Sequence, residues 1–178
     1  TVYYKVEGFI YMPIEALAMA ASNFIGQNIG ARNVERVKKG KSLSMKMCVG
    51  MTVLIGGIIM LFKTPILHIF TEEKEVVKYG SQFIMFIVPL YFIYAMNQIL
   101  SGVLRGAGKT FVPMLIGLVC MCGFRVGWLV VMMGIVKDVR IIYASYPLTW
   151  ILTNIAMTAY YYKSSWIKKT TLDAVETV

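Results

Sequence analysis

Five apolar stretches, each about as long as a lipid bilayer is thick, dominate this chain of 178 residues. They cover residues 8–29, 43–62, 83–104, 111–134 and 141–162. At about 1.5 Å rise per residue, about 20 mostly apolar residues let a helix cross the hydrocarbon core. A soluble domain of this length could not cover five such helices, because 58% of its residues are hydrophobic. Together with a mean hydropathy of +0.67, the pattern predicts an integral membrane protein.

The predicted fold class is an all-α integral membrane protein with five transmembrane helices. In lipid, only helices and closed barrels satisfy the backbone polar groups, and these stretches lack the alternation of barrel strands. We expect a single membrane domain over residues 1–178, with 163–178 as a cytoplasmic tail. Because the chain opens at Thr1 without a start methionine, we also expect it to be part of a longer protein.

Proline and glycine predict local features within these helices. A proline removes one backbone hydrogen bond, so we expect Pro89 and Pro147 to bend the third and fifth helices. Gly123 and Gly127 form a small-xxx-small pair, a spacing that favours close contact between membrane helices. The charged segment 71–78 is expected to form a short helical cap at the outer surface.

The basic residues predict the orientation of the chain, because Lys and Arg gather in cytoplasmic loops. The first connection, 31–42, holds five of them, the third connection two and the tail three, whereas the other connections are poorer or balanced by acids. The net charge of +9 therefore reflects topology, and we expect no nucleic-acid partner. We predict a multi-pass plasma-membrane protein, surrounded by lipid, with an outer N-terminus and a cytoplasmic C-terminus.

Two ionisable residues, Glu15 and Arg125, lie deep in the first and fourth spans. Such residues are costly in a membrane helix, so each needs a role. Glu15 shares a helical stripe with Tyr11, Ser22 and Gly26, which makes its face polar and narrow. It is either a proton, cation or cationic-substrate site, or a hydrogen-bonded structural residue. Because Arg125 lies at comparable depth, it could form an ion pair with Glu15, and structural pairing is its expected role.

Polar residues follow one face of the third span and, more weakly, of the fifth. A surface that faces lipid would not carry them, so these faces should meet protein or water. Contact between helices and a substrate path both explain the pattern. In the third span they are Tyr91, Tyr94, Asn97, Gln98, Ser101 and Arg105, and in the fifth Tyr146, Thr149, Trp150, Thr153 and Asn154. The residues proposed for an ion or substrate path are Glu15, Ser22, Tyr94, Asn97, Gln98, Ser101 and Asn154.

The sequence offers no pattern for a metal site or for catalysis. Cys120 and Cys122 are two residues apart and would point to different helix faces, and His68 is the single histidine. We therefore expect a structural histidine, no metal and no enzyme activity.

Several motifs resemble one family. The segment 18–31, AMAASNFIGQNIGA, followed by the basic segment 34–41, resembles the second helix and next loop of a half of a MATE (multidrug and toxic compound extrusion) transporter. The segment 101–110, SGVLRGAGKT, followed by Pro113, resembles the loop after the fourth helix of such a half. Phe124-Arg125 and Pro147-x-x-Trp150 resemble its last two helices, so the resemblance covers nearly the whole chain.

This resemblance implies a twelve-helix transporter with two six-helix halves, of which this chain supplies helices eight to twelve. Such a transporter exports drugs, other xenobiotics or metabolites by antiport with protons or sodium. The implied partners are the N-terminal half and a small organic substrate that can be cationic; no cofactor is expected beyond the coupling ion. In the sodium-coupled branch, a carboxylate in helix ten contributes to the cation site. Counting back from Arg105 puts Tyr94 at that position, which leaves Glu15 as the buried acid.

Other functions stay open at this point. A lipid-linked carrier flippase shares the architecture but favours a strongly cationic cavity. A membrane-embedded enzyme would need catalytic groups clustered at one depth, and a structural subunit would not need the polar faces.

Overall fold

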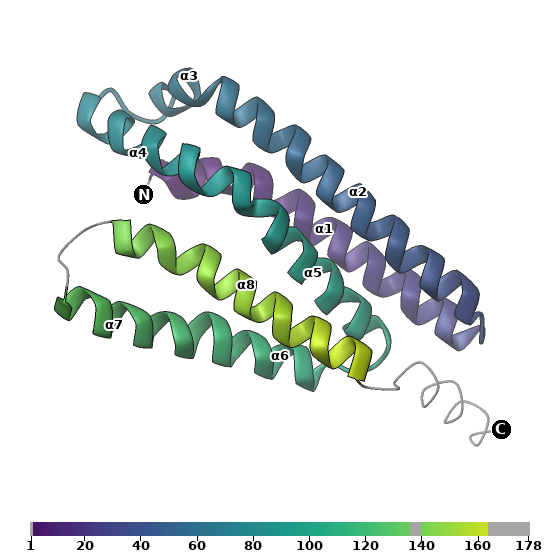
Figure 1. The fold of residues 1–178 in the computed structure, drawn as a ribbon. Helices are drawn as coiled ribbons and strands as arrows, with labels where there is room; N and C mark the ends of the chain where they lie inside the picture. The colour runs from purple at the N-terminus through teal and green to yellow at the C-terminus, as the bar shows by residue number, and fades with distance from the viewer. Residues whose placement is uncertain (1, 136–139, 164–178) are drawn as a thin grey trace.

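The computed structural model describes residues 2–135 and 140–163, which fold into five long helical rods without any strand in these ranges (Figure 1). Two of the rods are built from several helical segments in line, and one short helix, α3, lies between the second and third rods. The elements are α1 (Val2–Gly30), α2 (Val34–Leu61), α3 (Lys63–His68), α4 (Lys74–Ile87), η1 (Val88–Leu90), α5 (Tyr91–Gly106), α6 (Phe111–Gly117), η2 (Leu118–Phe124), α7 (Arg125–Ile135) and α8 (Arg140–Lys163).

The rods lie side by side, with α5 at the centre of the packing (Figure 1). Helices α1, α2 and α5 contact one another, and α8 packs on the opposite side of α5. The rod α6–η2–α7 packs on α8 and is the outermost of the five. The buried core consists mainly of side chains from α1 and α5, such as Ile14, Ile25, Ile99 and Val103. The all-α membrane fold predicted from the sequence is confirmed.

Four of the rods are long and apolar enough to cross a membrane by length and composition. They are Lys5–Gly30, Val34–Leu61, Lys74–Gly106 and Phe111–Ile135, and the corresponding predicted spans fall inside them or end within a residue of them. Helix α8 has the required length, but its Tyr, Ser, Thr and Asn residues lower its hydropathy, so its membrane crossing stays a prediction. The connection 136–139 and the predicted tail beyond Lys163 lie outside the described residues.

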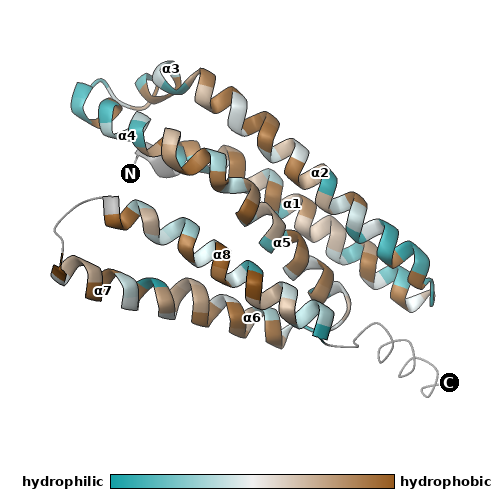
Figure 2. Ribbon diagram, viewed as in Figure 1, coloured by the Kyte–Doolittle hydropathy of each residue, from teal (hydrophilic) through white to brown (hydrophobic). Residues whose placement is uncertain are grey.

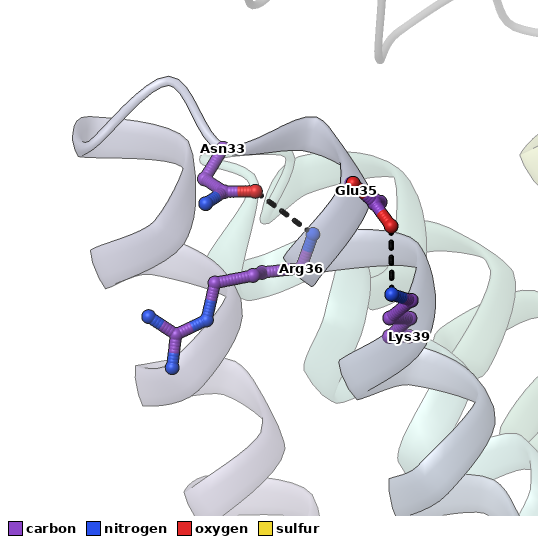
Figure 3. A network of polar contacts seen from close by, with 4 residues as sticks. All are labelled: Asn33, Glu35, Arg36 and Lys39. Atoms are coloured by element: carbon purple, nitrogen blue, oxygen red, sulfur yellow. Dashed lines mark hydrogen bonds and ion pairs between the residues drawn. The ribbon is translucent and has the colours of Figure 1, made fainter.

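The turn between α1 and α2 is tighter than the predicted connection 31–42. After Gly30, the last residue of α1, Arg32 lies in the left-handed region at φ 55°. The Asn33 amide donates to the Asn28 carbonyl oxygen and so satisfies a carbonyl of the last turn of α1. Asn33 then caps α2, accepting a hydrogen bond from the Arg36 amide at 3.0 Å (Figure 3). Arg32 therefore lies in the turn, whereas the other four basic residues of this segment lie on the first turns of α2.

The predicted cap at 71–78 is wrong as a separate element. Helix α4 begins at Lys74 and continues to Ile87, so the charged residues form the first turns of the third rod. The short helix at this end of the molecule is α3, which precedes the segment. At Pro89 the rod changes to the 3-10 turn η1, as the missing amide of a proline predicts. Helix α8, in contrast, continues through Pro147 as one helix.

Close helix contact occurs between α1 and α5. A Cβ atom added at Gly102 would lie 2.4 Å from the Ala18 carbonyl oxygen, and one at Gly106 would lie 2.2 Å from that of Ser22. Only glycine allows the two backbones to approach this far. Gly102 and Gly106, four residues apart on α5, therefore form a small-xxx-small pair that makes a close helix contact.

The predicted pair Gly123 and Gly127 does not make such a contact. A Cβ at Gly127 would meet no heavy atom within 4 Å, and one at Gly123 would meet only the Leu118 carbonyl oxygen of its own rod at 4.0 Å. Gly123 lies in η2, a π-helical stretch that interrupts the α-helix between α6 and α7. Both glycines belong to the outermost rod, where only 6% of the most apolar 18-residue stretch is buried inside the protein. Figure 2 shows that this exposed rod is largely hydrophobic, so lipid or further helices must cover it.

Candidate functional site

The carboxylate of Glu15 lies between α1 and α5, where two α5 side chains contact it. The Tyr94 hydroxyl donates to Glu15 Oε1 at 3.1 Å, and Gln98 Nε2 donates to the same oxygen. Gln98 Nε2 also donates to the Tyr94 hydroxyl oxygen at 2.6 Å, which closes a ring of three contacts. Tyr94 and Gln98 are four residues apart, so one face of α5 presents both groups to α1. The sequence predicted all three residues as site residues, and the structure brings them together.

A second carboxylate on α1 also faces α5. Glu7 lies eight residues before Glu15 and accepts a hydrogen bond from the Tyr91 hydroxyl of α5. Between the two acids, the Tyr11 ring stacks on the Tyr94 ring with centroids 4.9 Å apart. Glu7 is not among the site residues predicted from the sequence. Its spacing of four and eight residues from Tyr11 and Glu15 was the signal that could have identified it.

Aromatic rings cover the side of the site that faces α8. Trp150 of α8 is buried, and its ring centroid lies 5.1 Å from that of Tyr91 and 5.5 Å from that of Tyr94. Asn97 Nδ2 donates to the Trp150 carbonyl oxygen at 2.9 Å, and Asn154 Nδ2 donates to the Ile93 carbonyl oxygen at 2.9 Å. These two asparagines join α5 and α8 through their amide groups, so they position the aromatic rings beside the acid.

Arg125 does not form the predicted ion pair with Glu15. Its Nη2 donates to the Thr149 hydroxyl at 2.8 Å, and its guanidinium lies over the Tyr146 ring, 4.3 Å from the centroid. The reason is the order of the helices: Arg125 begins α7, which packs on α8, whereas Glu15 lies between α1 and α5. The comparable depth predicted from the sequence does not bring the two charges together, because α5 and α8 lie between α1 and α7. The contacts of Arg125 are with neutral partners, and its structural role stays a prediction.

Two predicted site residues lie apart from the acid. Ser22 is seven residues further along α1, about 10 Å at helical rise, where its backbone contacts Gly106. Ser101 is buried on α5, three residues beyond Gln98. Neither side chain contacts Glu15, so the acid and its direct partners form a smaller site than the sequence predicted.

The chemistry of this site is that of a carboxylate held by neutral groups. On the exposed surface, away from this site, Glu35 forms an ion pair with Lys39 at 2.7 Å (Figure 3). Over the residues that the structure describes, no group of three His, Cys, Asp or Glu side chains could hold a metal, and His68 is exposed on α3. A carboxylate with hydroxyl and amide neighbours can bind a proton or a small hard cation.

Comparisons with known proteins identify the family of this chain. The family model described as MatE matches residues 1–131. The "Probable multidrug resistance protein YoeA" of Bacillus subtilis is 25% identical over 93% of this chain and 36% of the relative. The "Probable multidrug resistance protein NorM" of Thermotoga maritima is 30% identical over 63% of the chain and 24% of the relative.

A vertebrate relative is similar at the same level. The "Multidrug and toxin extrusion protein 1" of Danio rerio is 32% identical over 67% of this chain and 20% of its own length. The chain therefore spans about a third or less of the curated relatives that it matches. Since the family model covers most of the residues, the chain belongs to the MatE family.

Proposed function

We propose that this chain forms most of one half of a secondary active efflux transporter in the plasma membrane. The transporter would export drugs or other small organic molecules, including cationic ones, by antiport with protons or sodium. Membership of the MatE family supports the class of function. The largely exposed, apolar rod α6–η2–α7 is consistent with a chain that needs lipid and a second half around it.

The observation that carries the coupling part of this proposal is the environment of Glu15. Its carboxylate is half-buried at membrane depth and contacts the Tyr94 hydroxyl and the Gln98 amide, both neutral. A carboxylate that serves only structure is commonly matched by a cation, because an unmatched charge is costly in this setting. A carboxylate with neutral partners can instead gain and lose a cation during a transport cycle.

The partner of Glu15 gives independent support. The resemblance to the sodium-coupled branch puts a cation-binding carboxylate at position 94 of the third rod. This chain has Tyr94 there, and its hydroxyl donates to Glu15 of the neighbouring helix. We propose that Glu15 supplies from α1 the carboxylate that the third rod lacks.

The lipid-carrier flippase is less well supported. That function favours a strongly cationic cavity, and Arg125 would be its main basic residue here. The Arg125 guanidinium already contacts the Thr149 hydroxyl and the Tyr146 ring.

Transport by the complete protein tests the role of Glu15. We would reconstitute wild type, Glu15→Gln and the matched control Glu35→Gln, and measure dye export under a proton gradient and under a sodium gradient separately. Glu35 is an exposed acid on α2, so its removal changes the charge without affecting the site. We expect Glu15→Gln to abolish export driven by one of the two ions while thermal stability is retained. Wild-type export by Glu15→Gln under both gradients would refute the coupling role.

A further inference from the structure

A small pocket lies at the basic end of the bundle, between α2, α5 and α8. It has a volume of about 140 Å³, close to that of four or five water molecules at about 30 Å³ each. Met45, Met96 and Leu100 form its apolar walls. The remaining lining residues are Lys41, Asn154, Thr158, Tyr161 and Tyr162. Glu15, Tyr94 and Gln98 do not line this pocket.

The lysine in this pocket has an unusual environment. Lys41 is half-buried, and its Nζ lies 3.8 Å from the centroid of the Tyr161 ring and 5.4 Å from that of Tyr162. Over residues 2–135 and 140–163, no carboxylate lies within ion-pair distance of this ammonium group. The nearby lysine of the same helix turn, Lys39, is by contrast exposed and paired with Glu35. A half-buried cation between aromatic rings attracts an anion, because the rings fix its position without neutralising its charge.

The position along the helix indicates where this anion would come from. Lys41 lies just before the long apolar part of α2 begins, at the level where a membrane helix meets the lipid head groups. Lysine and tyrosine are the residues that membrane proteins place at this level. Basic pockets between membrane helices bind anionic head groups, and the methionine walls suit the adjoining apolar part of a lipid.

We propose that the pocket around Lys41 binds the phosphate group of an anionic phospholipid, with the start of its acyl region against Met45, Met96 and Leu100. Lys41 would contact the phosphate directly. The hydroxyl of Thr158, an exposed residue that lines the pocket, would be the second group to contact the phosphate. The occupied pocket would tie α8 to α2 and α5 through one lipid molecule.

Native mass spectrometry of the complete purified transporter can measure this binding lipid by lipid. The probes are dioleoylphosphatidylglycerol, dioleoylphosphatidylcholine and soluble glycerol phosphate. We expect Lys41→Gln to weaken binding of the first phosphatidylglycerol about fivefold or more and to leave phosphatidylcholine unchanged. The matched control is Lys38→Gln, which removes the same charge from an exposed position on the same helix and should change neither lipid. Thr158→Phe, which fills the pocket from an exposed position, should also weaken phosphatidylglycerol binding.

Three outcomes would overturn the proposal. Equal phosphatidylglycerol binding by wild type and Lys41→Gln, with Thr158→Phe also unchanged, would exclude the pocket as the site. An equal loss in Lys38→Gln and Lys41→Gln would mean general attraction to a basic surface. Displacement of phosphatidylglycerol by glycerol phosphate at the same concentration would mean that the pocket takes a soluble phosphate ester, and the lipid assignment would be wrong.

Discussion

Replacing Gly106 by alanine should separate α1 from α5 and destabilise the protein. The new Cβ atom would lie 2.2 Å from the Ser22 carbonyl oxygen and 3.1 Å from the Ile25 Cβ atom. Neither the backbone oxygen nor a Cβ atom can move without its helix, so the two rods must shift apart. Overpacking of this kind costs about 1–3 kcal/mol, and the short distance favours the upper end. Gly106 is the last residue of α5, so the better helix propensity of alanine recovers little, and we expect a net loss of about 2–3 kcal/mol.

The matched control is Gly50→Ala in the middle of α2, where a Cβ atom would meet nothing within 4 Å. This variant should be neutral or slightly more stable than wild type. Unfolding of the complete protein in a denaturing-detergent titration gives both free energies under the same conditions. The Gly106→Ala variant should also export less, because the shift moves Glu15 away from the Tyr94 hydroxyl and the Gln98 amide. Equal stability of the two alanine variants would refute the close approach of α1 and α5.

Three further predictions concern topology and polar contacts. In a Cys122→Ser background, a cysteine introduced at exposed Glu73 should react with a membrane-impermeant thiol reagent in intact cells, and one at exposed Lys39 should not. The reverse labelling would show that the predicted orientation is wrong. In a double-mutant cycle, Glu15→Gln and Arg125→Gln should be additive in stability within about 0.5 kcal/mol, because their contacts are separate; a larger coupling would mean that the charges interact. Asn97→Ala should lower the free energy of unfolding by about 1–3 kcal/mol, because the Trp150 carbonyl oxygen loses the hydrogen bond that the Asn97 amide donates. An unchanged free energy in thermal or detergent unfolding would show that this bond is unimportant.

Periodicity in the sequence correctly identified the helices and the polar face of the third rod. Tyr94, Gln98 and Asn97 recur at helical spacing, and in the structure all three meet protein groups. Their partners could not be predicted in the same way. Spacing fixes the depth and the face of a residue on its own helix, but the neighbour depends on the order of helices in the bundle. Counting residues along the spans predicts similar depth for Glu15 and Arg125, but the two residues belong to rods that do not pack on each other.

The glycine pairs illustrate the same limit. Gly123 and Gly127 have the spacing of a helix-contact motif, yet their rod is the most exposed one. Gly102 and Gly106 have the same spacing within a segment that was interpreted through its family resemblance instead. Which glycine pair makes a close contact depends on which rod is central, and that follows from tertiary packing alone.

The rings around Trp150 give the protein an intrinsic optical signal at the site. The indole lies 5.1 Å from the Tyr91 ring and 5.5 Å from the Tyr94 ring between centroids, and the Tyr94 hydroxyl donates to Glu15. At such separations tyrosine excitation transfers to tryptophan, and the indole emission depends on the electric field of nearby charges. A proton or cation that arrives at Glu15 should therefore change the colour or intensity of Trp150 fluorescence. Phenylalanine can replace Trp128, Trp166 and any tryptophan in the rest of the complete protein, which leaves the Trp150 fluorescence alone. Ion binding at Glu15 then becomes visible without an added dye.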